Sequence, residues 1–383
     1  MRRGAWEAAA TVSVALALSA CVPLTPQAES SSQAAATAPS AVVDPSGEPS
    51  AEPATASAIP LAELDLLADP HAYEGPSTAT MADAAVEVLD PAPLPTLPVA
   101  VTSHTRGGDV EVHVADTSRV VAFDMSGSIA ATLWALGQGG SLVGRDVAAE
   151  FPGTEDIPVV TGSSHTINPE AVLELEPSVV ITDGSIGPTD AVEQIADAGV
   201  PVVHVENEAS FDGAGELARQ VAAALGVASA GEDLAAQIAR DVAATRAEIA
   251  ALAPEQGLRV MMLYLRGASG IYYMFGDESG ADDLVAGLAG VDVAAEIGLD
   301  GMKPLTDEAM LAADPEVILV MSHGLDSVGG VDGLLEAKPA IALTAAGQHR
   351  RIVDMADSQL LAFGPRSAAI LDALARAVYA PES

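Results

Sequence analysis

The sequence contains one cysteine, Cys21, in 383 residues, and it has few basic and few aromatic residues. A single cysteine excludes an intrachain disulfide. Lys and Arg number 16 against 54 Asp and Glu, which gives a formal net charge of -38 at pH 7. This negative charge repels the phosphates of nucleic acids and the surface of anionic membranes, so we expect no nucleic-acid partner.

Catalytic sequence signatures are also missing. The chain has no nucleophile elbow, no P-loop and no dinucleotide-binding fingerprint, and the glycine-rich stretch 137–144 lacks the strand and helix that such a fingerprint needs. The sequence therefore predicts a protein that is not an enzyme. Apolar residues make up 49% of it, which is enough to form the cores of two domains of ordinary size.

The beginning of the sequence has the pattern of an export signal. Arg2 and Arg3 precede an apolar stretch over 8–20, which is too short for a stable membrane span. Residues 1–20 are interpreted as a lipoprotein signal peptide, because the letters LSA before Cys21 resemble the lipobox at which bacterial lipoproteins are cleaved and acylated. We expect acyl chains on Cys21 to anchor the protein at the extracytoplasmic face of the cell membrane.

Residues 21–96 are interpreted as a low-complexity tether followed by an ambiguous lead-in. The first half is rich in Ala, Ser, Pro, Thr and Glu without periodic apolar residues, so burial does not offset its ordering entropy. The second half combines weak helical spacing with a proline-rich linker. Ordered structure is expected to begin near Leu97, with a hairpin over 98–117 that turns at two glycines.

From there the apolar stretches alternate between strand and helix patterns, which predicts an α/β fold with parallel sheets. Two consecutive helices, 213–227 and 230–254, interrupt the alternation, and the second is long enough to connect two lobes. We therefore expect two Rossmann-like lobes, 97–212 and 257–383, joined by the helical connection 213–256. The expected strands are 119–123, 141–144, 158–162, 178–184 and 200–205 in the first lobe, and 258–267, 271–276, 316–322 and 350–355 in the second.

The two lobes share an internal repeat. The segment NPEAVLELEPSVVIT, 168–182, aligns without gaps with TDEAMLAADPEVILV, 306–320. In each copy a helix precedes a strand, and Glu170 is matched by Glu308. A carboxylate in the first turn of a helix interacts favourably with the helix dipole, which is a structural reason for both glutamates.

Several motifs over about 65–383 carry a family resemblance. They are HAYEGPSTA (71–79), VGRD (143–146), PVVTGSSHTINPEAVLELEP (158–177), TDGSIGP (182–188), YLRG (264–267), MSHGLDSVGGVDGLL (321–335) and LLAFGPR (360–366). In this order they make the chain similar to substrate-binding lipoproteins of ABC importers whose lobes are joined by one long helix. Within that class it resembles the haem-binding proteins of bacterial haem uptake. The resemblance implies a class III periplasmic-binding-protein fold, haem (hemin) as the transported ligand, and ABC permease and ATPase subunits as partners.

The resemblance also implies roles for particular residues. In the family a histidine of the first lobe and a tyrosine of the second coordinate the haem iron, with an arginine near the tyrosine, and His165, Tyr264 and Arg266 occupy the matching positions. Two serines precede His165 where a glycine is expected from the family. Glu170 and Glu308 match the surface glutamates, one on each lobe, that dock arginines of the permease.

The residue types are consistent with these roles. His165 follows an expected strand at the carboxyl edge of an open sheet, where such folds bind ligands, although a surface histidine bonded to a nearby carbonyl fits the same pattern. Tyr264 and Arg266 are two positions apart on an expected strand, so their side chains share a face. Ferric iron and a nearby guanidinium both favour the phenolate form of a tyrosine. A core tyrosine beside an edge arginine is the alternative.

Other residues are weaker candidates. The stretch Tyr272, Tyr273, Met274 and Phe275 either walls a porphyrin pocket or belongs to an ordinary strand core, and Met274 is disfavoured as an axial ligand beside a Tyr/His pair. The remaining histidines lack the spacing of a zinc site. They are His71, His104, His113, His204, His323 and His349. Of these, His323 is a candidate for facing the cleft, and Arg145 and Arg366 are candidate propionate partners on charge alone.

Two alternatives to haem stay open. The same fold in related importers binds a ferric siderophore or cobalamin, and a lipid-anchored envelope enzyme or structural lipoprotein would carry the same export signal. Uptake of hemin with a Soret absorption band distinguishes haem binding from all of these.

Overall fold

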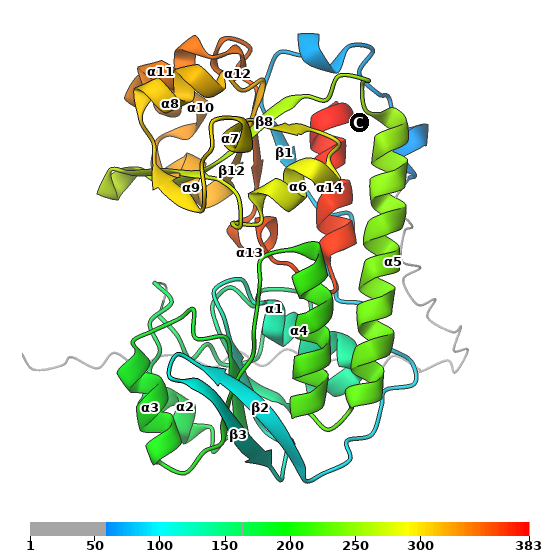
Figure 1. The fold of residues 1–383 in the computed structure, drawn as a ribbon, viewed down its shortest axis with the longest axis vertical. Helices are drawn as coiled ribbons and strands as arrows, with labels where there is room; N and C mark the ends of the chain where they lie inside the picture. The colour runs from blue at the N-terminus through cyan, green and yellow to red at the C-terminus, as the bar shows by residue number, and fades with distance from the viewer. Residues whose placement is uncertain (1–58, 163, 383) are drawn as a thin grey trace, which may run out of the picture. The chain divides into compact units, whose positions relative to one another are not determined.

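The structure is a computed structural model that describes residues 59–162 and 164–382. The expected signal peptide, Cys21 and most of the low-complexity segment lie outside the described residues. In the described part, no helix combines the length and the apolar character needed to cross a membrane. Two sheets with separate sets of helices form two lobes, which confirms the predicted α/β class (Figure 1).

The first lobe is built on a four-stranded parallel sheet in the order β5-β4-β6-β7. Its strands are β4 (Val120–Phe123), β5 (Leu142–Arg145), β6 (Val179–Thr182) and β7 (Val202–His204), and its helices are α1 (Ser128–Leu133), α2 (Pro169–Glu174) and α3 (Thr189–Asp197). The predicted hairpin is present as β2 (Val99–Thr105) and β3 (Gly108–Val114). The strand expected over 158–162 is reduced to isolated bridges, because its register with β5 lasts for one residue pair, Arg145 and Val159.

The second lobe contains a sheet in the order β1-β13-β12-β8-β9-β11, with β10 also paired to β8. Its strands are β1 (Ser77–Ala79), β8 (Arg259–Arg266), β9 (Ile271–Phe275), β10 (Val291–Asp292), β11 (Met302–Pro304), β12 (Val317–Met321) and β13 (Ile352–Met355). Its helices are α6 (Ala281–Gly287), α7 (Val293–Glu296), α8 (Asp307–Ala313), α9 (Ser322–Ser327), α10 (Gly330–Ala337), α11 (Pro339–Leu343), α12 (Ala345–Gln348), α13 (Asp357–Leu360) and α14 (Ser367–Tyr379). All pairings are parallel except those of β9, which is antiparallel to both of its neighbours, β8 and β11.

Ordered structure begins earlier than the sequence predicted. Strand β1 pairs in parallel with β13, so the segment before Leu97 completes the sheet of the second lobe. The His71 imidazole fastens the same segment, with Nδ1 2.8 Å from a Glu316 carboxylate oxygen and Nε2 2.9 Å from the Gln256 carbonyl. These partners lie far away in the sequence, and a local pattern of apolar residues carries no trace of them.

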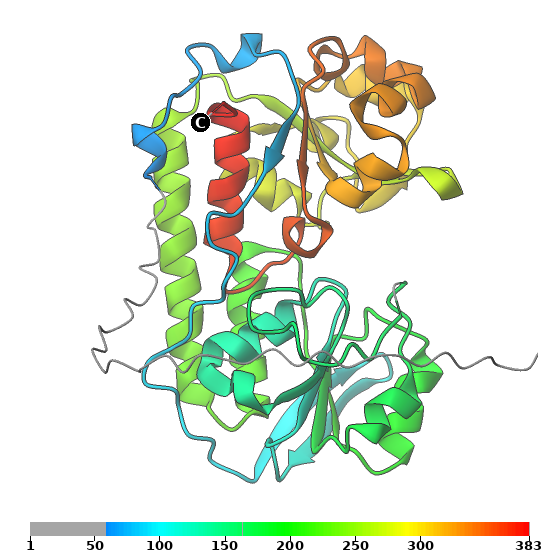
Figure 2. The same cartoon turned by 180° about the vertical axis from the view of Figure 1, so that it is seen from behind.

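Two long helices join the lobes, as predicted. Helix α4 (Phe211–Ala224) packs against α5 (Ala228–Leu252), and α5 also packs against α14 of the second lobe (Figures 1 and 2). The backbone N–H of Phe211 donates to the Asp283 carboxylate of α6 at 2.7 Å, so α4 begins against the second lobe. The Phe211 ring makes an edge contact with Phe363, with ring centroids 5.3 Å apart.

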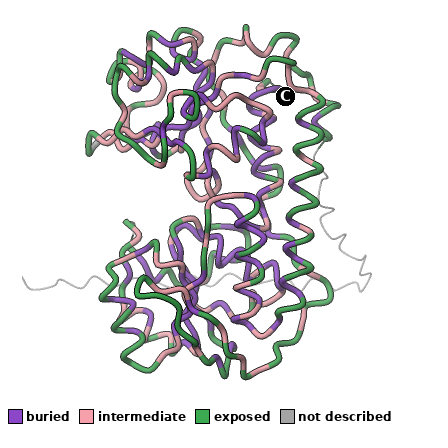
Figure 3. Tube along the Cα trace, viewed as in Figure 1, coloured by how far each residue is buried: buried purple, intermediate pink, exposed green. Residues whose placement is uncertain are grey.

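The apolar core is continuous from one lobe to the other. One cluster of buried residues includes β4 and α1 of the first lobe, the inner faces of α4 and α5, and β8, β13 and α14 of the second. Two smaller clusters fill the opposite faces of the two sheets. In Figure 3 the buried residues follow the strands and the packed helix faces, and the exposed residues lie on the outer turns.

Candidate functional site

The loops after β4, β5 and β6 bring polar side chains together at the carboxyl edge of the first sheet. Asp124 follows β4, Asp146 follows β5 and Asp183 follows β6. His165 belongs to a longer loop held at this edge by backbone bridges between Thr161 and Ile167 and between Thr166 and Gly187. The position predicted for His165, at the carboxyl edge of an open α/β sheet, is therefore observed.

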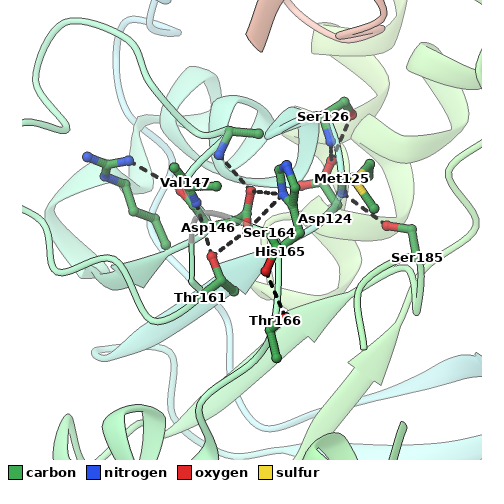
Figure 4. Close-up of polar contacts among 12 residues, drawn as sticks. Asp124, Met125, Ser126, Asp146, Val147, Thr161, Ser164, His165, Thr166 and Ser185 are labelled. Atoms are coloured by element: carbon green, nitrogen blue, oxygen red, sulfur yellow. Dashed lines mark hydrogen bonds and ion pairs between the residues drawn. The ribbon is translucent and has the colours of Figure 1, made fainter. Parts of the chain in front are cut away.

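The His165 side chain is anchored by Asp146 (Figure 4). Its Nδ1 lies 3.0 and 3.3 Å from the two carboxylate oxygens of Asp146. The Asp146 side chain is fully buried, and 27% of the His165 side chain is exposed. Among the described residues, only Nδ1 of the His165 ring makes a hydrogen bond, so Nε2 on the opposite side of the ring is available to a ligand.

The backbone at His165 has a conformation that non-glycine residues rarely adopt, with φ at 54°. A tight turn holds it there, because the His165 N–H donates to the Gly162 carbonyl and the Gly162 N–H donates to the Thr166 carbonyl, each at 2.9 Å. The family pattern has a glycine in this loop, and glycine readily adopts a left-handed backbone conformation. Here His165 itself has that conformation. Rare backbone conformations of this kind are concentrated at functional sites.

A second buried carboxylate, Asp124, lies at the same edge. It accepts hydrogen bonds from the backbone N–H groups of Ser128 and Ile129 and from the Ser126 hydroxyl. Burial and, to a smaller extent, the negative charge of Asp183 together raise the pKa of Asp124 to about 7. The Asn207 side-chain amide donates to the Asp183 carboxylate at 2.9 Å and so holds Asp183 in place.

On the second lobe, Tyr264 and Arg266 share a face of β8 as predicted. The Arg266 guanidinium carbon lies 4.6 Å from the centroid of the Tyr264 ring, which is cation–π geometry. The same guanidinium donates from Nη2 to the Asp357 carboxylate at 3.3 Å. Arg266 is therefore held between a tyrosine ring and a carboxylate, and all three side chains are partly exposed.

The aromatic stretch on β9 divides between the two faces of the sheet. Tyr273 is directly opposite Tyr264 in the ladder, so both lie on the same face. Phe275 lies on that face as well and contacts the Tyr264 ring edge-on, with centroids 6.5 Å apart. Tyr272 and Met274 point to the other face, where Met274 is only 2% exposed within the core of the second lobe. Met274 thus has the environment of a core residue.

The two arginines considered for propionates have structural partners. Arg145 donates to the carbonyls of Thr154 and Asp146 and so supports the loop after β5. Arg366 is 3% exposed, lies with its guanidinium carbon 5.3 Å from the Phe151 ring, and donates from Nη2 to the Ser358 carbonyl at 3.4 Å. Its burial lowers the pKa of Arg366 to about 10.

The Arg366 contacts also show how the two lobes approach each other. Phe151 belongs to the loop that starts at Asp146, and Ser358 belongs to α13, which starts at Asp357 beside Arg266. The segment after α13 also brings Gly364 next to Ser128 of α1. Contacts between the two lobes therefore lie near both edges. His165 belongs to the edge of the first lobe, and Tyr264 and Arg266 belong to the edge of the second.

The other histidines have mainly local partners. His104 pairs with Asp109 and His113 with Glu111, while the backbone N–H of His204 donates to Ser103. Burial lowers the pKa of His204. His323 is exposed at the start of α9, and its backbone N–H donates to Asp357 at 3.0 Å. In the described part of the chain no three His, Cys, Asp or Glu side chains are arranged to hold a metal ion.

A separate cavity of about 720 Å³ lies within the first lobe, between the β2–β3 hairpin and α3. Valine side chains of both elements line its walls together with Ala196 of α3, and Arg106, another lining residue, donates to the Gly184 carbonyl and the Thr189 hydroxyl. It does not include His165, Tyr264 or Arg266.

Glu170 and Glu308 occupy equivalent positions, as the repeat predicted. Each is exposed in the first turn of a short helix, α2 or α8. The helices are capped alike, because the side chains of Asn168 and Thr306 accept hydrogen bonds from Ala171 and Ala309 at 3.2 Å. The two carboxylates therefore face solvent from matching places on the two lobes.

Sequence reasoning missed Asp146 and Asp357, the carboxylates that hold His165 and Arg266. Asp146 is the last letter of the VGRD motif, 19 positions before His165, and Asp357 lies 91 positions after Arg266. The VGRD motif was a signal for the first of these. Nothing local to Asp357 marks it as a partner of Arg266.

Comparison with known proteins agrees with the fold. A family model described as periplasmic binding protein matches residues 124–358. The crystal structure of the haem binding protein HmuT is 38% identical, with a TM-score of 0.75, and the match covers 82% of this chain and 99% of that one. HmuT structures also include variants with a histidine, a tyrosine or an arginine replaced by alanine, and the separations among those three positions equal those among His165, Tyr264 and Arg266.

Curated relatives are more distant. A cobalamin-binding protein of Halobacterium salinarum is 26% identical over 207 residues, which are 53% of this chain and 54% of that protein, so the match spans about half of the relative's length. The uncharacterized ABC transporter substrate-binding lipoprotein YvrC of Bacillus subtilis is 22% identical over 64% of this chain and 76% of its own.

Proposed function

Because the chain belongs to the periplasmic binding protein family, we propose that it captures haem between its two lobes and delivers it to an ABC importer. The axial ligands of the iron are His165 from the first lobe and Tyr264 from the second. One observation carries this proposal: the first lobe presents His165, whose Nε2 makes no hydrogen bond among the described residues, and the second lobe presents Tyr264 with Arg266 beside it.

The histidine side of the site is suited to iron. A neutral imidazole is a good donor to iron near neutral pH, and Nδ1 of His165 is already occupied by Asp146, which leaves Nε2 as the donor atom. The partial exposure of the ring gives a planar ligand access to that nitrogen.

The tyrosine side is suited to ferric iron in particular. A phenolate ligand needs the loss of a proton whose ordinary pKa is about 10. The Arg266 guanidinium, 4.6 Å from the ring centroid, stabilises the resulting negative charge, and the ferric ion does the same when it binds. Tyr273 shares the face with Tyr264 and is partly exposed, so it supplies aromatic surface for a porphyrin, while the buried Phe275 supports the Tyr264 ring from the core.

The comparisons support haem as the cargo. HmuT, the solved relative at 38% identity, is described as a haem binding protein, and its alanine variants include a histidine, a tyrosine and an arginine with the spacing found here. For delivery, we propose that Glu170 and Glu308 dock on the permease, because each lobe presents one exposed carboxylate at an equivalent helix start.

We also propose that the protein is exported and held to the membrane through acylated Cys21. The support is the sequence pattern of residues 1–21 and the similarity to a relative described as a substrate-binding lipoprotein of an ABC transporter. Mass spectrometry of the membrane fraction tests this, because acylation adds a diacylglycerol mass to a peptide that begins at Cys21. Replacement of Cys21 by serine should release the protein from the membrane.

A second candidate cargo is cobalamin, because the Halobacterium salinarum relative is described as a cobalamin-binding protein. Titration of the purified protein with hemin, cobalamin and a ferric siderophore separates the candidates. We expect a Soret shift and an increase in melting temperature with hemin alone. If the melting temperature rises with cobalamin or the siderophore and not with hemin, that ligand is the cargo and the haem proposal is wrong.

A further inference from the structure

The carboxylate of Asp146 has an unusual environment for a purely structural residue. It is fully buried, and in the described chain it makes no ion pair with a lysine or an arginine. The Arg145 guanidinium donates to the main-chain carbonyl of Asp146 and not to its carboxylate. Burial of an unpaired carboxylate is costly unless hydrogen bonds compensate for lost water.

Three groups supply those hydrogen bonds. The Ala148 N–H donates at 2.6 Å, and Nδ1 of His165 lies 3.0 Å from the same oxygen. The Thr161 hydroxyl donates to the other oxygen at 2.5 Å, and Figure 4 shows Thr161 and His165 on either side of the carboxylate. A carboxylate only accepts hydrogen bonds, so the contact with His165 requires a proton on Nδ1. The contacts with Ala148 and Thr161 do not require a negative charge. The charge of Asp146 acts specifically on the His165 imidazole, because it favours the proton on Nδ1.

The loop fixes the same ring from its backbone. The left-handed conformation of His165 and the turn between Gly162 and Thr166 set the direction in which the side chain leaves the main chain. With the backbone fixed on one side and Nδ1 fixed by Asp146, the ring has one orientation. Its Nε2 points away from the carboxylate and makes no hydrogen bond among the described residues.

We propose that Asp146 is the positioning residue of the histidine ligand. Its carboxylate keeps the proton on Nδ1 of His165, presents the lone pair of Nε2 to the haem iron, and strengthens that nitrogen as a donor. Partners of this kind orient metal-binding histidines and raise their basicity. The part that concerns iron rests on the proposed function, whereas the placement of the proton on Nδ1 is a property of the protein without ligand.

The test therefore has one measurement without haem and one with it. NMR of protein labelled with ¹⁵N-histidine reports which ring nitrogen of His165 carries the proton, and the His165→Gln variant assigns the signal. We expect Nδ1–H in the wild type and a shift toward Nε2–H, the form that free histidine prefers, in Asp146→Ala. Asp146→Asn keeps an oxygen acceptor without the charge, so its tautomer ratio should lie between the two.

With haem, the readouts are the hemin dissociation rate and the EPR spectrum of the ferric complex. We expect Asp146→Ala to weaken hemin binding roughly 10- to 100-fold and to increase the high-spin signal, since a weaker axial donor splits the iron d orbitals less. Asp146→Asn should again be intermediate. It is isosteric, so it also keeps the test informative if the alanine variant does not fold.

Thr154→Val is the matched control. It removes the hydroxyl that bonds to Phe151 N–H and carbonyl in the same buried loop, and it has no contact with His165. We expect it to change neither the tautomer nor the EPR spectrum. If the Asp146 variants match Thr154→Val in both measurements, Asp146 only supports the loop and the inference is wrong. If the wild type takes up no hemin, the proposed function fails, and the NMR result alone then decides the role of Asp146.

Discussion

The guanidinium of Arg266 lies over the ring of Tyr264 and simultaneously contacts the carboxylate of Asp357. The arginine charge therefore has two neighbours, and in the proposed haem complex one of them, the Tyr264 phenolate, is negative. The proposal thus predicts that the strength of the tyrosine ligand depends on a charge that does not itself touch the iron.

Tyr264 and Arg266 should act as one unit in hemin binding. We expect Arg266→Ala to weaken hemin binding about 10-fold, since the phenolate loses its stabilising charge. Tyr264→Phe should weaken it more, because the oxygen ligand itself is lost. In a Tyr264→Phe background, Arg266→Ala should have little further effect, and a double-mutant cycle by hemin titration measures this coupling. Additive losses would show that the arginine acts independently of the tyrosine.

Stability should depend on the ionisation of Asp124. Burial raises its pKa from 3.8 to about 7 in the folded protein, so the folded state binds its proton more tightly than the unfolded chain. Its contribution to stability is thus complete below the unfolded pKa and is lost as the pH rises through about 7. We expect this group to lower the free energy of unfolding by at most about 1.4 kcal/mol per pH unit between pH 5 and pH 7.

Asp124→Asn removes this titration and keeps an oxygen to accept from α1. Urea unfolding at pH 5 and pH 8 should then show a smaller loss of stability for the variant than for the wild type. An equal loss in both proteins would mean that Asp124 stays ionised throughout this range.

The two lobes should depend on Phe211 for their attachment at the start of α4. Its ring contacts Phe363 and lies among Leu284, Leu360 and Ile370 of the second lobe. We expect Phe211→Ala to lower the free energy of unfolding by about 3–5 kcal/mol, and Phe211→Leu to lower it less. Urea unfolding measures both, and a loss below about 1 kcal/mol for the alanine variant would show that this contact is not part of the core.

Charge reversal at Glu170 and Glu308 should separate haem capture from delivery. We expect the variant with lysine at both positions to bind hemin like the wild type and to fail in haem-dependent growth. Lysine in the first turn of a helix also costs about 0.3–1 kcal/mol per site, so a control with the same change of charge is needed. Lysine at Glu193 of α3 and Glu336 of α10, two exposed glutamates on other helices of the two lobes, should leave uptake intact. Equal loss of growth in both variants would contradict docking through the first pair.

The sequence predicted those parts of the fold and site that depend on short spacing. The two-residue separation of Tyr264 and Arg266 on a strand correctly places them on one face, and the repeat correctly predicts matching helix starts at Glu170 and Glu308. The hairpin at 98–117 and the long helix are confirmed for the same reason, since their patterns are local.

Features that depend on distant partners were not predicted. The pairing of β1 with β13 joins segments at opposite ends of the described chain, so the start of ordered structure was placed too late. The contacts of Asp146 with His165 and of Asp357 with Arg266 depend on which loops the topology brings together. The sequence also does not determine the faces of β9, because only its register with β8 shows that Tyr273 and Phe275 share a face with Tyr264 while Met274 is buried on the other side.

The central claim is that His165 and Tyr264 bind opposite faces of one haem iron, and absorption spectra of the hemin complexes test it most directly. The wild type, His165→Ala, Tyr264→Phe and the double variant are mixed with hemin and compared at equal concentration. We predict a Soret band for the wild type that differs from free hemin, a distinct altered spectrum for each single variant, and the spectrum of free hemin for the double variant. A wild-type spectrum that the double replacement leaves unchanged would contradict the claim.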